Sequence, residues 1–154
     1  MTRVAVALGS NLGNRGATLH AAVGALAAFI DRLHVSSFHE TDPVGMPGSP
    51  APFLNAAAVG ETALTASDLL DRLLAIEQGA GRERPHPGAS RTLDLDLILY
   101  DAAIIDAAPR LIVPHPRFRE RRFVLAPLAE VAGDWADPVT GVTVSGLLQA
   151  LDTL

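Results

Sequence analysis

Apolar residues recur along the chain in two patterns, and their order predicts the order of strands and helices. Val4–Leu8 is an uninterrupted apolar run that stops at Gly9-Ser10-Asn11, as is typical of a buried strand. Asn14 can then cap a helix, because apolar residues follow it with the helical period of about 3.6. These residues are Leu19, Ala22, Val23, Leu26, Ile30 and Leu33. A second strand is expected at Val35–His39.

Predicted strands and helices continue to alternate through the middle of the chain. Phe53–Glu61 predicts a strand, and Thr65 with Asp68 resembles a capping box that opens a helix ending at Gly79. The apolar positions of this helix are Leu69, Leu70, Leu73 and Leu74. Leu93–Tyr100 predicts the next strand. The resulting order β-α-β-β-α-β predicts an α+β fold of the ferredoxin-like class, in which an antiparallel sheet carries helices on one face.

Shorter elements follow this core, and two irregular segments interrupt it. Edge strands are expected at Ile104, Ile105 and Leu111–Val113, and helices near Glu120–Val131 and Val144–Leu151. Asp42–Pro52 contains four prolines and two glycines, and Gly79–Ser90 contains three glycines and two prolines. Segments of this length without regular structure are commonly binding loops, so we expect two long active-site loops. No repeat or linker divides the sequence, and residues 1–154 are expected to form one domain.

Composition excludes several classes of protein. An apolar content of 49% with only 19% charged residues excludes an intrinsically disordered chain. The absence of cysteine excludes disulfide scaffolds and thiolate chemistry. The longest apolar stretch, Leu19–Ile30, is shorter than the roughly 20 residues that cross a membrane, and Val4–Leu8 is too short for a signal peptide. We therefore expect a cytoplasmic domain without a membrane partner.

Charge is distributed unevenly. The chain carries twelve basic and seventeen acidic residues, and every basic residue is arginine. Eight of the arginines lie between Arg82 and Arg122. Arginine gathered on one segment of an acidic chain favours a compact polyanion such as phosphate, whereas nucleic-acid binding normally requires a broad basic face. A solvated arginine surface is the alternative interpretation.

Two acidic residues follow the arginine-rich loop at alternate positions of a predicted strand. Asp94 and Asp96 would share one face, and the leucines between and beside them would share the other. Two adjacent carboxylates repel each other unless a cation lies between them, and carboxylate oxygens suit Mg²⁺ that also binds water and substrate phosphates. Arg82, Arg84 and Arg91 flank the pair and can neutralise phosphate charge. Two ordinary acids on a solvated strand are the alternative.

Four short motifs, in order and at matching spacing, carry a family resemblance. They are Gly9-Ser10-Asn11-Leu12-Gly13-Asn14, Phe53-Leu54-Asn55-Ala56-Ala57, Arg91-Thr92-Leu93-Asp94-Leu95-Asp96, and Val113-Pro114-His115-Pro116 through Arg121 and Phe123. From Val4 to about Val131 the chain resembles 6-hydroxymethyl-7,8-dihydropterin pyrophosphokinase, an enzyme family of folate biosynthesis. The resemblance implies Mg²⁺-dependent transfer of diphosphate from ATP to the hydroxymethyl group of the pterin, with release of AMP.

The resemblance also implies roles for individual residues. Asp94 and Asp96 would hold two Mg²⁺ ions, and Arg82 and Arg91 would complete the catalytic set. The implied pterin site consists of Thr41, Asp42, Val44, Phe53, Asn55 and Phe123. The implied ATP site consists of Glu77, Arg82, Arg84, Arg91, Arg110, His115 and Arg121. The expected partners are these small molecules and no nucleic acid, and the protein is expected to be a monomer.

Some positions depart from the family pattern. The segment Pro85–Ser90 lacks a tryptophan and some basic residues that members usually carry before the residue equivalent to Arg91. Phe53 and Ile112 stand where some members have tyrosine and threonine. Two alternatives therefore stay open. One is a nucleotidyltransferase with a two-carboxylate site on the same kind of sheet, and the other is a non-catalytic binding module of the same fold.

Overall fold

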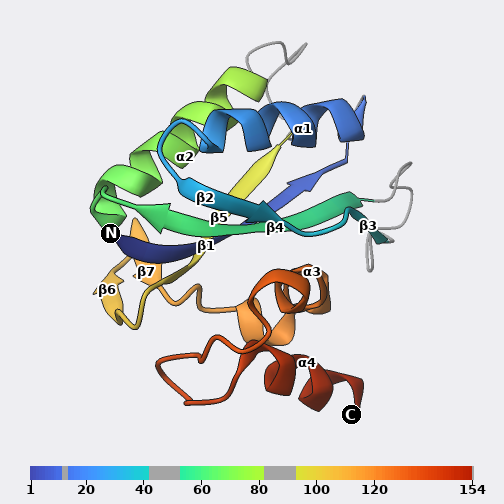
Figure 1. The fold of residues 1–154 in the computed structure, drawn as a ribbon, viewed down its shortest axis with the longest axis vertical. Helices are drawn as coiled ribbons and strands as arrows, with labels where there is room; N and C mark the ends of the chain where they lie inside the picture. Colours follow the sequence, from blue (N-terminus) through green and yellow to red (C-terminus); the bar gives the residue numbers. More distant parts are fainter. Residues whose placement is uncertain (12–13, 42–52, 82–92, 154) are drawn as a thin grey trace.

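The centre of the computed structural model is a five-stranded antiparallel sheet (Figure 1). The structure describes residues 1–11, 14–41, 53–81 and 93–153. The strands are β1 (Thr2–Ser10), β2 (Asp31–Val35), β3 (His39–Thr41), β4 (Phe53–Thr62) and β5 (Asp94–Tyr100). Their spatial order is β2-β4-β1-β5, and β3 pairs with the first residues of β4.

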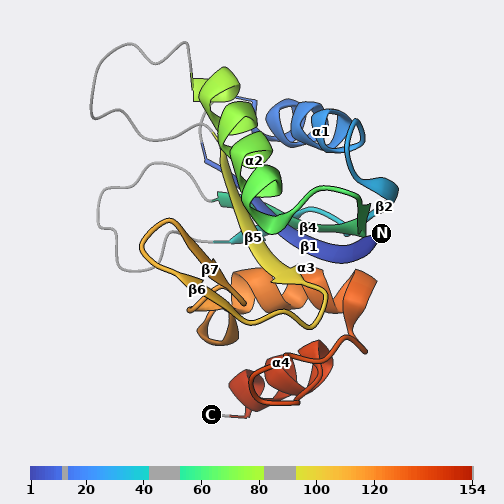
Figure 2. The same cartoon turned by 90° about the vertical axis from the view of Figure 1, so that its left-hand side faces the viewer.

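Helices lie on both sides of this sheet (Figures 1 and 2). Helices α1 (Arg15–Leu26) and α2 (Ala66–Gly81) cover one face, α3 (Arg122–Ala132) lies against the opposite face, and α4 (Val144–Asp152) packs on α3. The element order and the antiparallel pairing confirm the predicted ferredoxin-like α+β fold. The layer formed by α3 and α4 goes beyond the predicted arrangement, which places helices on one face only.

Alternation along β1 explains why both faces are covered. Val4, Val6 and Leu8 are buried in the core formed with α1 and α2. Ala5 and Ala7 point the other way and are buried in a second core, to which α3 contributes its apolar side chains. The central strand is therefore apolar on both faces, and its side chains toward α3 are small.

The first helix ends earlier than the apolar period predicts. Helix α1 stops at Leu26, where the N–H groups of Ala28 and Phe29 bond carbonyl oxygens three residues back and tighten the last turn. Ile30 is buried in the following connection, and Leu33 already belongs to β2. The prediction of a helix reaching Leu33 is wrong, because residues of a turn and a strand continue the helical spacing by coincidence.

The second strand is correspondingly displaced. It covers Asp31–Val35 rather than the predicted Val35–His39, and β3 follows as a separate short strand. Gly60 of β4 permits this close connection, because a Cβ atom there would lie 2.5 Å from the side chain of Ile30. Arg32 adopts a positive φ of 54° at the irregular start of β2. A backbone conformation of this kind leaves no periodic signal in the sequence.

The second helix begins as predicted and ends later. The Thr65 hydroxyl oxygen accepts the N–H of Asp68 at 3.1 Å, which confirms the expected cap. The helix continues through Gly79 to Gly81, so Gly79 is not its end. An interior glycine costs about 1 kcal/mol relative to alanine. Burial of Leu69 and Leu73 on the same helix offsets that cost.

The C-terminal elements lie close to their predicted positions. A 3-10 turn, η1 (Phe118–Glu120), precedes α3, where the sequence predicts a single helix from Glu120. Strands β6 (Ile105–Ala107) and β7 (Leu111–Val113) form a separate hairpin, with Ile104 just outside it. Across residues 1–11, 14–41, 53–81 and 93–153, no helix is long and apolar enough to span a membrane.

Candidate active site

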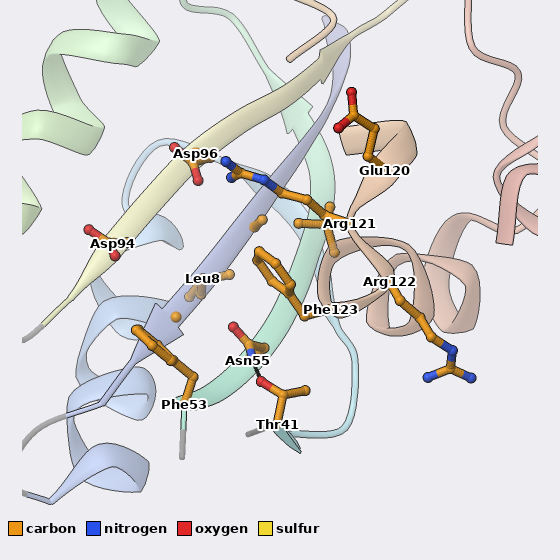
Figure 3. Close-up of a pocket in the computed structure, with 13 residues that line it drawn as sticks. Leu8, Thr41, Phe53, Asn55, Asp94, Asp96, Glu120, Arg121, Arg122 and Phe123 are labelled. Atoms are coloured by element: carbon orange, nitrogen blue, oxygen red, sulfur yellow. Dashed lines mark hydrogen bonds between the residues drawn. The ribbon is translucent and has the colours of Figure 1, made fainter. Parts of the chain in front are cut away.

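A cavity of about 660 Å³ opens where the end of β1, the start of β4 and the start of α3 meet (Figure 3). It lies on the α3 side of the sheet. Seven of the residues that the sequence assigns to the site line it: Thr41, Phe53, Asn55, Asp94, Asp96, Arg121 and Phe123. The other lining residues are Ala7, Leu8, Gly9, Glu120, Arg122 and Val124. The fold thus brings together residues that are as much as 117 positions apart in sequence, from Ala7 to Val124.

Strand register explains how the polar side chains are spaced across this cavity. Asn55, Gly9 and Asp94 are direct neighbours on β4, β1 and β5. Ala7 lies between Ala57 and Asp96 in the next row on the same face. A Cβ atom on Gly9 would lie 3.1 Å from Asn55 Oδ1, which is tighter than ordinary contact. The small residues of β1 therefore form the floor between an amide on one side and two carboxylates on the other.

The amide of Asn55 is held in one orientation. Asn55 is 5% exposed, and its Nδ2 donates to the hydroxyl oxygen of Thr41 on β3 at 2.6 Å. With Nδ2 turned toward Thr41, Oδ1 lies over Gly9 at the cavity floor. A buried, oriented amide of this kind can hydrogen-bond the edge of a heterocycle.

Two phenylalanines enter the same cavity from separate elements. Phe53 is half-buried at the first residue of β4, and Phe123 projects from the first turn of α3 (Figure 3). Phe123 is 41% exposed, so a large part of its ring is available for contact. The guanidinium carbon of Arg121 lies 5.6 Å from the centre of the Phe123 ring. Aromatic walls beside an oriented amide suit a flat, polar-edged ring.

The acidic pair lies where strand alternation predicts. Asp94 and Asp96 are half-buried on the cavity side of β5, while Leu95 and Leu97 are buried on the opposite face. Within the described part of the chain, no group of three or more His, Cys, Asp or Glu side chains could hold a metal ion. Two carboxylates alone leave most coordination positions to other oxygens. This donor set fits Mg²⁺, which keeps water and substrate-phosphate ligands.

Arg121 connects the aromatic and acidic parts of the cavity. It directly precedes the first residue of α3 in an extended backbone conformation, and Figure 3 shows its side chain extending toward Asp96. The cavity therefore contains a cation that can approach phosphate beside the carboxylates.

His115 lies outside the cavity lining, interacts electrostatically with Asp96 and is held by hydrogen bonds to the backbone. Its N–H donates to the Ile98 carbonyl oxygen at 3.0 Å, and its Nδ1 accepts the N–H of Arg117 at 3.2 Å. Burial lowers the pKa of the His115 imidazole, and the negative charge of Asp96 opposes this shift. The positive charges of Arg121 and Arg117 lower the pKa further. The lowered pKa favours the neutral ring, in which Nδ1 accepts from Arg117 and Nε2–H is the available donor.

Two further predicted ATP residues, like His115, lie outside the cavity lining. Glu77 accepts the N–H of Leu95 at 2.7 Å and so ties α2 to β5 beside the acidic pair. Arg110 donates to the Ser67 hydroxyl at 3.1 Å and pairs with Asp71, so it joins the β6–β7 hairpin to α2. Their roles toward ATP stay predictions. The remaining predicted site residues, Asp42, Val44, Arg82, Arg84 and Arg91, lie outside the described residues.

The sequence reasoning missed six lining residues. Gly9 and Ala7 have no chemistry of their own, and only the register with β4 and β5 shows that they make room. Glu120 and Arg122 flank Arg121 in the chain and line the same cavity. Arg122 also donates to Asp152 of α4 at 2.8 Å. Glu120 and Arg122 belong to a run of charged residues in the sequence, but such a run does not identify which side chains face a cavity.

Comparison with known proteins gives a consistent result. Residues 5–133 match the family model described as 7,8-dihydro-6-hydroxymethylpterin-pyrophosphokinase. A protein named 2-amino-4-hydroxy-6-hydroxymethyldihydropteridine pyrophosphokinase from Methylorubrum extorquens is 41% identical over 99% of this chain and 95% of its own length. Proteins of the same name from Bacillus subtilis and Synechocystis are 46% and 40% identical over 82% and 96% of this chain, and 75% of theirs.

A solved structure shows the same fold. The crystal structure of Plasmodium falciparum HPPK-DHPS superposes with a TM-score of 0.77 at 12% identity. The match covers 97% of this chain but only 44% of the Plasmodium chain, so this chain corresponds to less than half of that protein.

Proposed function

The chain belongs to the 7,8-dihydro-6-hydroxymethylpterin-pyrophosphokinase family, and from this premise we propose that ATP, with Mg²⁺, is its diphosphate donor and 6-hydroxymethyl-7,8-dihydropterin its acceptor. Family membership makes it a pyrophosphokinase of folate biosynthesis. The observation that carries the finer proposal is that one cavity combines an acidic pair, an arginine, an oriented amide and two aromatic walls.

The pterin occupies the part of the cavity nearest Thr41. Its ring lies against Phe53 and Phe123, and the fixed amide of Asn55 bonds its edge. Asp42 and Val44, which lie outside the described residues, belong to the same proposed pterin site. This placement directs the hydroxymethyl group along the sheet toward Asp94 and Asp96, because Gly9 and Ala7 leave an open path between them.

ATP occupies the acidic and basic part of the cavity. The hydroxymethyl oxygen attacks the β-phosphorus of ATP, the bond to the oxygen bridging the α- and β-phosphorus breaks, and AMP leaves. The hydroxyl proton passes to water. Arg121 and the neutral Nε2–H of His115 donate to phosphate oxygens, and positioning and charge neutralisation supply most of the rate. Glu77, Arg82, Arg84, Arg91 and Arg110 complete the proposed ATP site.

Asp94 and Asp96 are the residues that would hold Mg²⁺, and we expect two ions. Bound there, the metal would neutralise triphosphate charge and orient the phosphates for in-line transfer. On the protein side, β5 fixes the two carboxylates because it pairs along this stretch with β1.

The direct test is AMP formation from ATP and the hydroxymethyl dihydropterin, measured with and without Mg²⁺. AMP that requires both the pterin and the metal supports the proposal. Release of pyrophosphate would instead indicate a nucleotidyltransferase, and pterin binding without turnover would indicate a binding module. We further propose that residues 1–154 act as one cytoplasmic, monomeric domain, and light scattering after size-exclusion chromatography tests the monomer.

A further inference from the structure

The edge of the sheet is interrupted between β2 and β3. Ser36 stays in the ladder, since its N–H donates to the Ala57 carbonyl oxygen and its hydroxyl oxygen accepts the Ala57 N–H, both at 2.9 Å. At Ser37 the backbone N–H turns away from β4 and bonds a side chain instead. The connection into β3 is therefore anchored by something other than the sheet.

That anchor is Glu130 on α3. Its carboxylate accepts the Ser37 N–H at 2.8 Å and the Ser37 hydroxyl at 2.9 Å, and it also contacts His39 Nε2. The bond from the Ser37 backbone lowers the pKa of Glu130; burial opposes this, and the His39 contact adds to it. The Glu130 carboxylate thus joins His39 and Ser37, which precede it by 91 and 93 positions, across the face of the sheet that holds the cavity.

The anchored segment leads directly to the pterin end of the cavity. His39 lies opposite Asn55 in the β3–β4 pairing, and Thr41 lies two residues further along the same face. Thr41 is the acceptor that fixes the Asn55 amide, at 2.6 Å. A shift of β3 would therefore move the acceptor on which the orientation of Asn55 depends.

The same helix also carries one wall of the pterin slot. Phe123 precedes Glu130 by seven residues on α3, which is about two helical turns, so the two side chains project from the same side of the helix. Holding β3 to α3 at Glu130 therefore sets Thr41 and Asn55 at a defined place relative to Phe123.

We propose that Glu130 is a positioning residue for the pterin: it clamps β3 to α3 through Ser37 and His39, and so fixes the Thr41–Asn55 pair opposite Phe123. This role rests on the proposed function, because it concerns the same pterin site. Glu130 lies outside the cavity lining and acts only through Thr41 and Asn55.

The test compares two ligands on one variant. The Kd of 6-hydroxymethylpterin and the Kd of a non-hydrolysable ATP analogue with Mg²⁺ are measured for the wild type, Glu130→Gln and Asp134→Asn. Asp134 is an exposed acid just after α3 and provides a control for the loss of one charge. We expect Glu130→Gln to raise the pterin Kd about five- to tenfold, as one mispositioned hydrogen bond would, and to change the ATP-analogue Kd less than about twofold. Asp134→Asn should change neither.

A double-mutant cycle separates positioning from simple destabilisation. If Glu130 acts through Thr41, adding Glu130→Gln to Thr41→Val should weaken pterin binding little beyond Thr41→Val alone. Additive losses, equal weakening of both ligands, or an unchanged pterin Kd would each overturn the proposal. His39→Ala, which keeps the bonds from Ser37, provides the same comparison if Glu130→Gln does not fold.

Failure of this role and failure of the proposed function give different results. A wild type that neither binds the pterin nor forms AMP overturns the proposed function, and with it the role of Glu130. A wild type that does both, with a Glu130→Gln variant of normal pterin affinity, overturns the role of Glu130 alone.

Discussion

Replacing Phe123 by alanine should weaken pterin binding selectively, and the exposure of its ring sets the expected size. Phe123 is 41% exposed. A phenylalanine buries about 200 Å² when fully covered, so about 80 Å² is available to a ligand. At about 25 cal/mol per Å² this area is worth about 2 kcal/mol, and ring stacking adds about 1 kcal/mol. The pterin Kd should therefore rise by about 100-fold or somewhat more.

Fluorescence titration with 6-hydroxymethylpterin measures the effect, and the Kd of a non-hydrolysable ATP analogue serves as the internal reference. Ile104→Ala is the matched control, because Ile104 is 64% exposed and lies outside the cavity. Since Phe123 is already partly exposed, its truncation should cost little folding stability. A pterin Kd within a fewfold of the wild type would refute the assignment of Phe123 as a wall of the slot.

Three further predictions concern the acidic pair, the C-terminal core and the cavity floor. Asp96→Asn should lower kcat at least about 100-fold, and near-normal turnover would contradict this. The Tm of the protein without ligands should stay level or rise slightly, because the variant relieves repulsion between neighbouring carboxylates. Asp137 is fully buried, and although burial raises its pKa, the hydrogen bonds it accepts, led by that from Arg119, lower it to about 2. Its contribution of about 2 kcal/mol is present above pH 4 and lost as the pH falls toward 2, so urea unfolding should show Asp137→Asn clearly destabilised at pH 7 and much less so at pH 2. Gly9→Ala should raise the pterin Kd about tenfold, because the added methyl group crowds the Asn55 amide and one displaced hydrogen bond is worth roughly that much. Gly24→Ala, which has open space around it, should leave the pterin Kd unchanged. Equal Kd values for the two variants would contradict the proposed floor.

Short-range sequence patterns account for the parts of the structure that the sequence predicts well. The positions of Asp94 and Asp96 on one face of β5 follow from the two-residue period of a strand, and the buried run Val4–Leu8 becomes the central strand β1. The cap at Thr65 depends on four consecutive residues, Thr65–Asp68, and is equally local. Each of these features is determined within a few positions of the residue concerned.

Features that depend on contacts across the fold were wrong or absent in the sequence prediction. The end of α1 depends on how Gly60 admits the connection into β2, and nothing near Leu26 signals it. The floor at Gly9 depends on strand register, and the clamp at Glu130 joins segments about 90 positions apart. The roles of individual site residues came from a family resemblance. The structure brings seven of them into one cavity, while their functions stay predictions.

The central claim is that this cavity transfers an intact diphosphate to the pterin, and isotope tracing tests it most directly. The protein is incubated with Mg²⁺, 6-hydroxymethyl-7,8-dihydropterin and ATP labelled in separate experiments at the β- or the γ-phosphorus. The account predicts that both labels appear in the pterin product in equal amount, with one unlabelled AMP released for each product, and that Asp96→Asn abolishes both. Transfer of the γ-label alone, or labelled pyrophosphate free in solution with no labelled pterin, would contradict it.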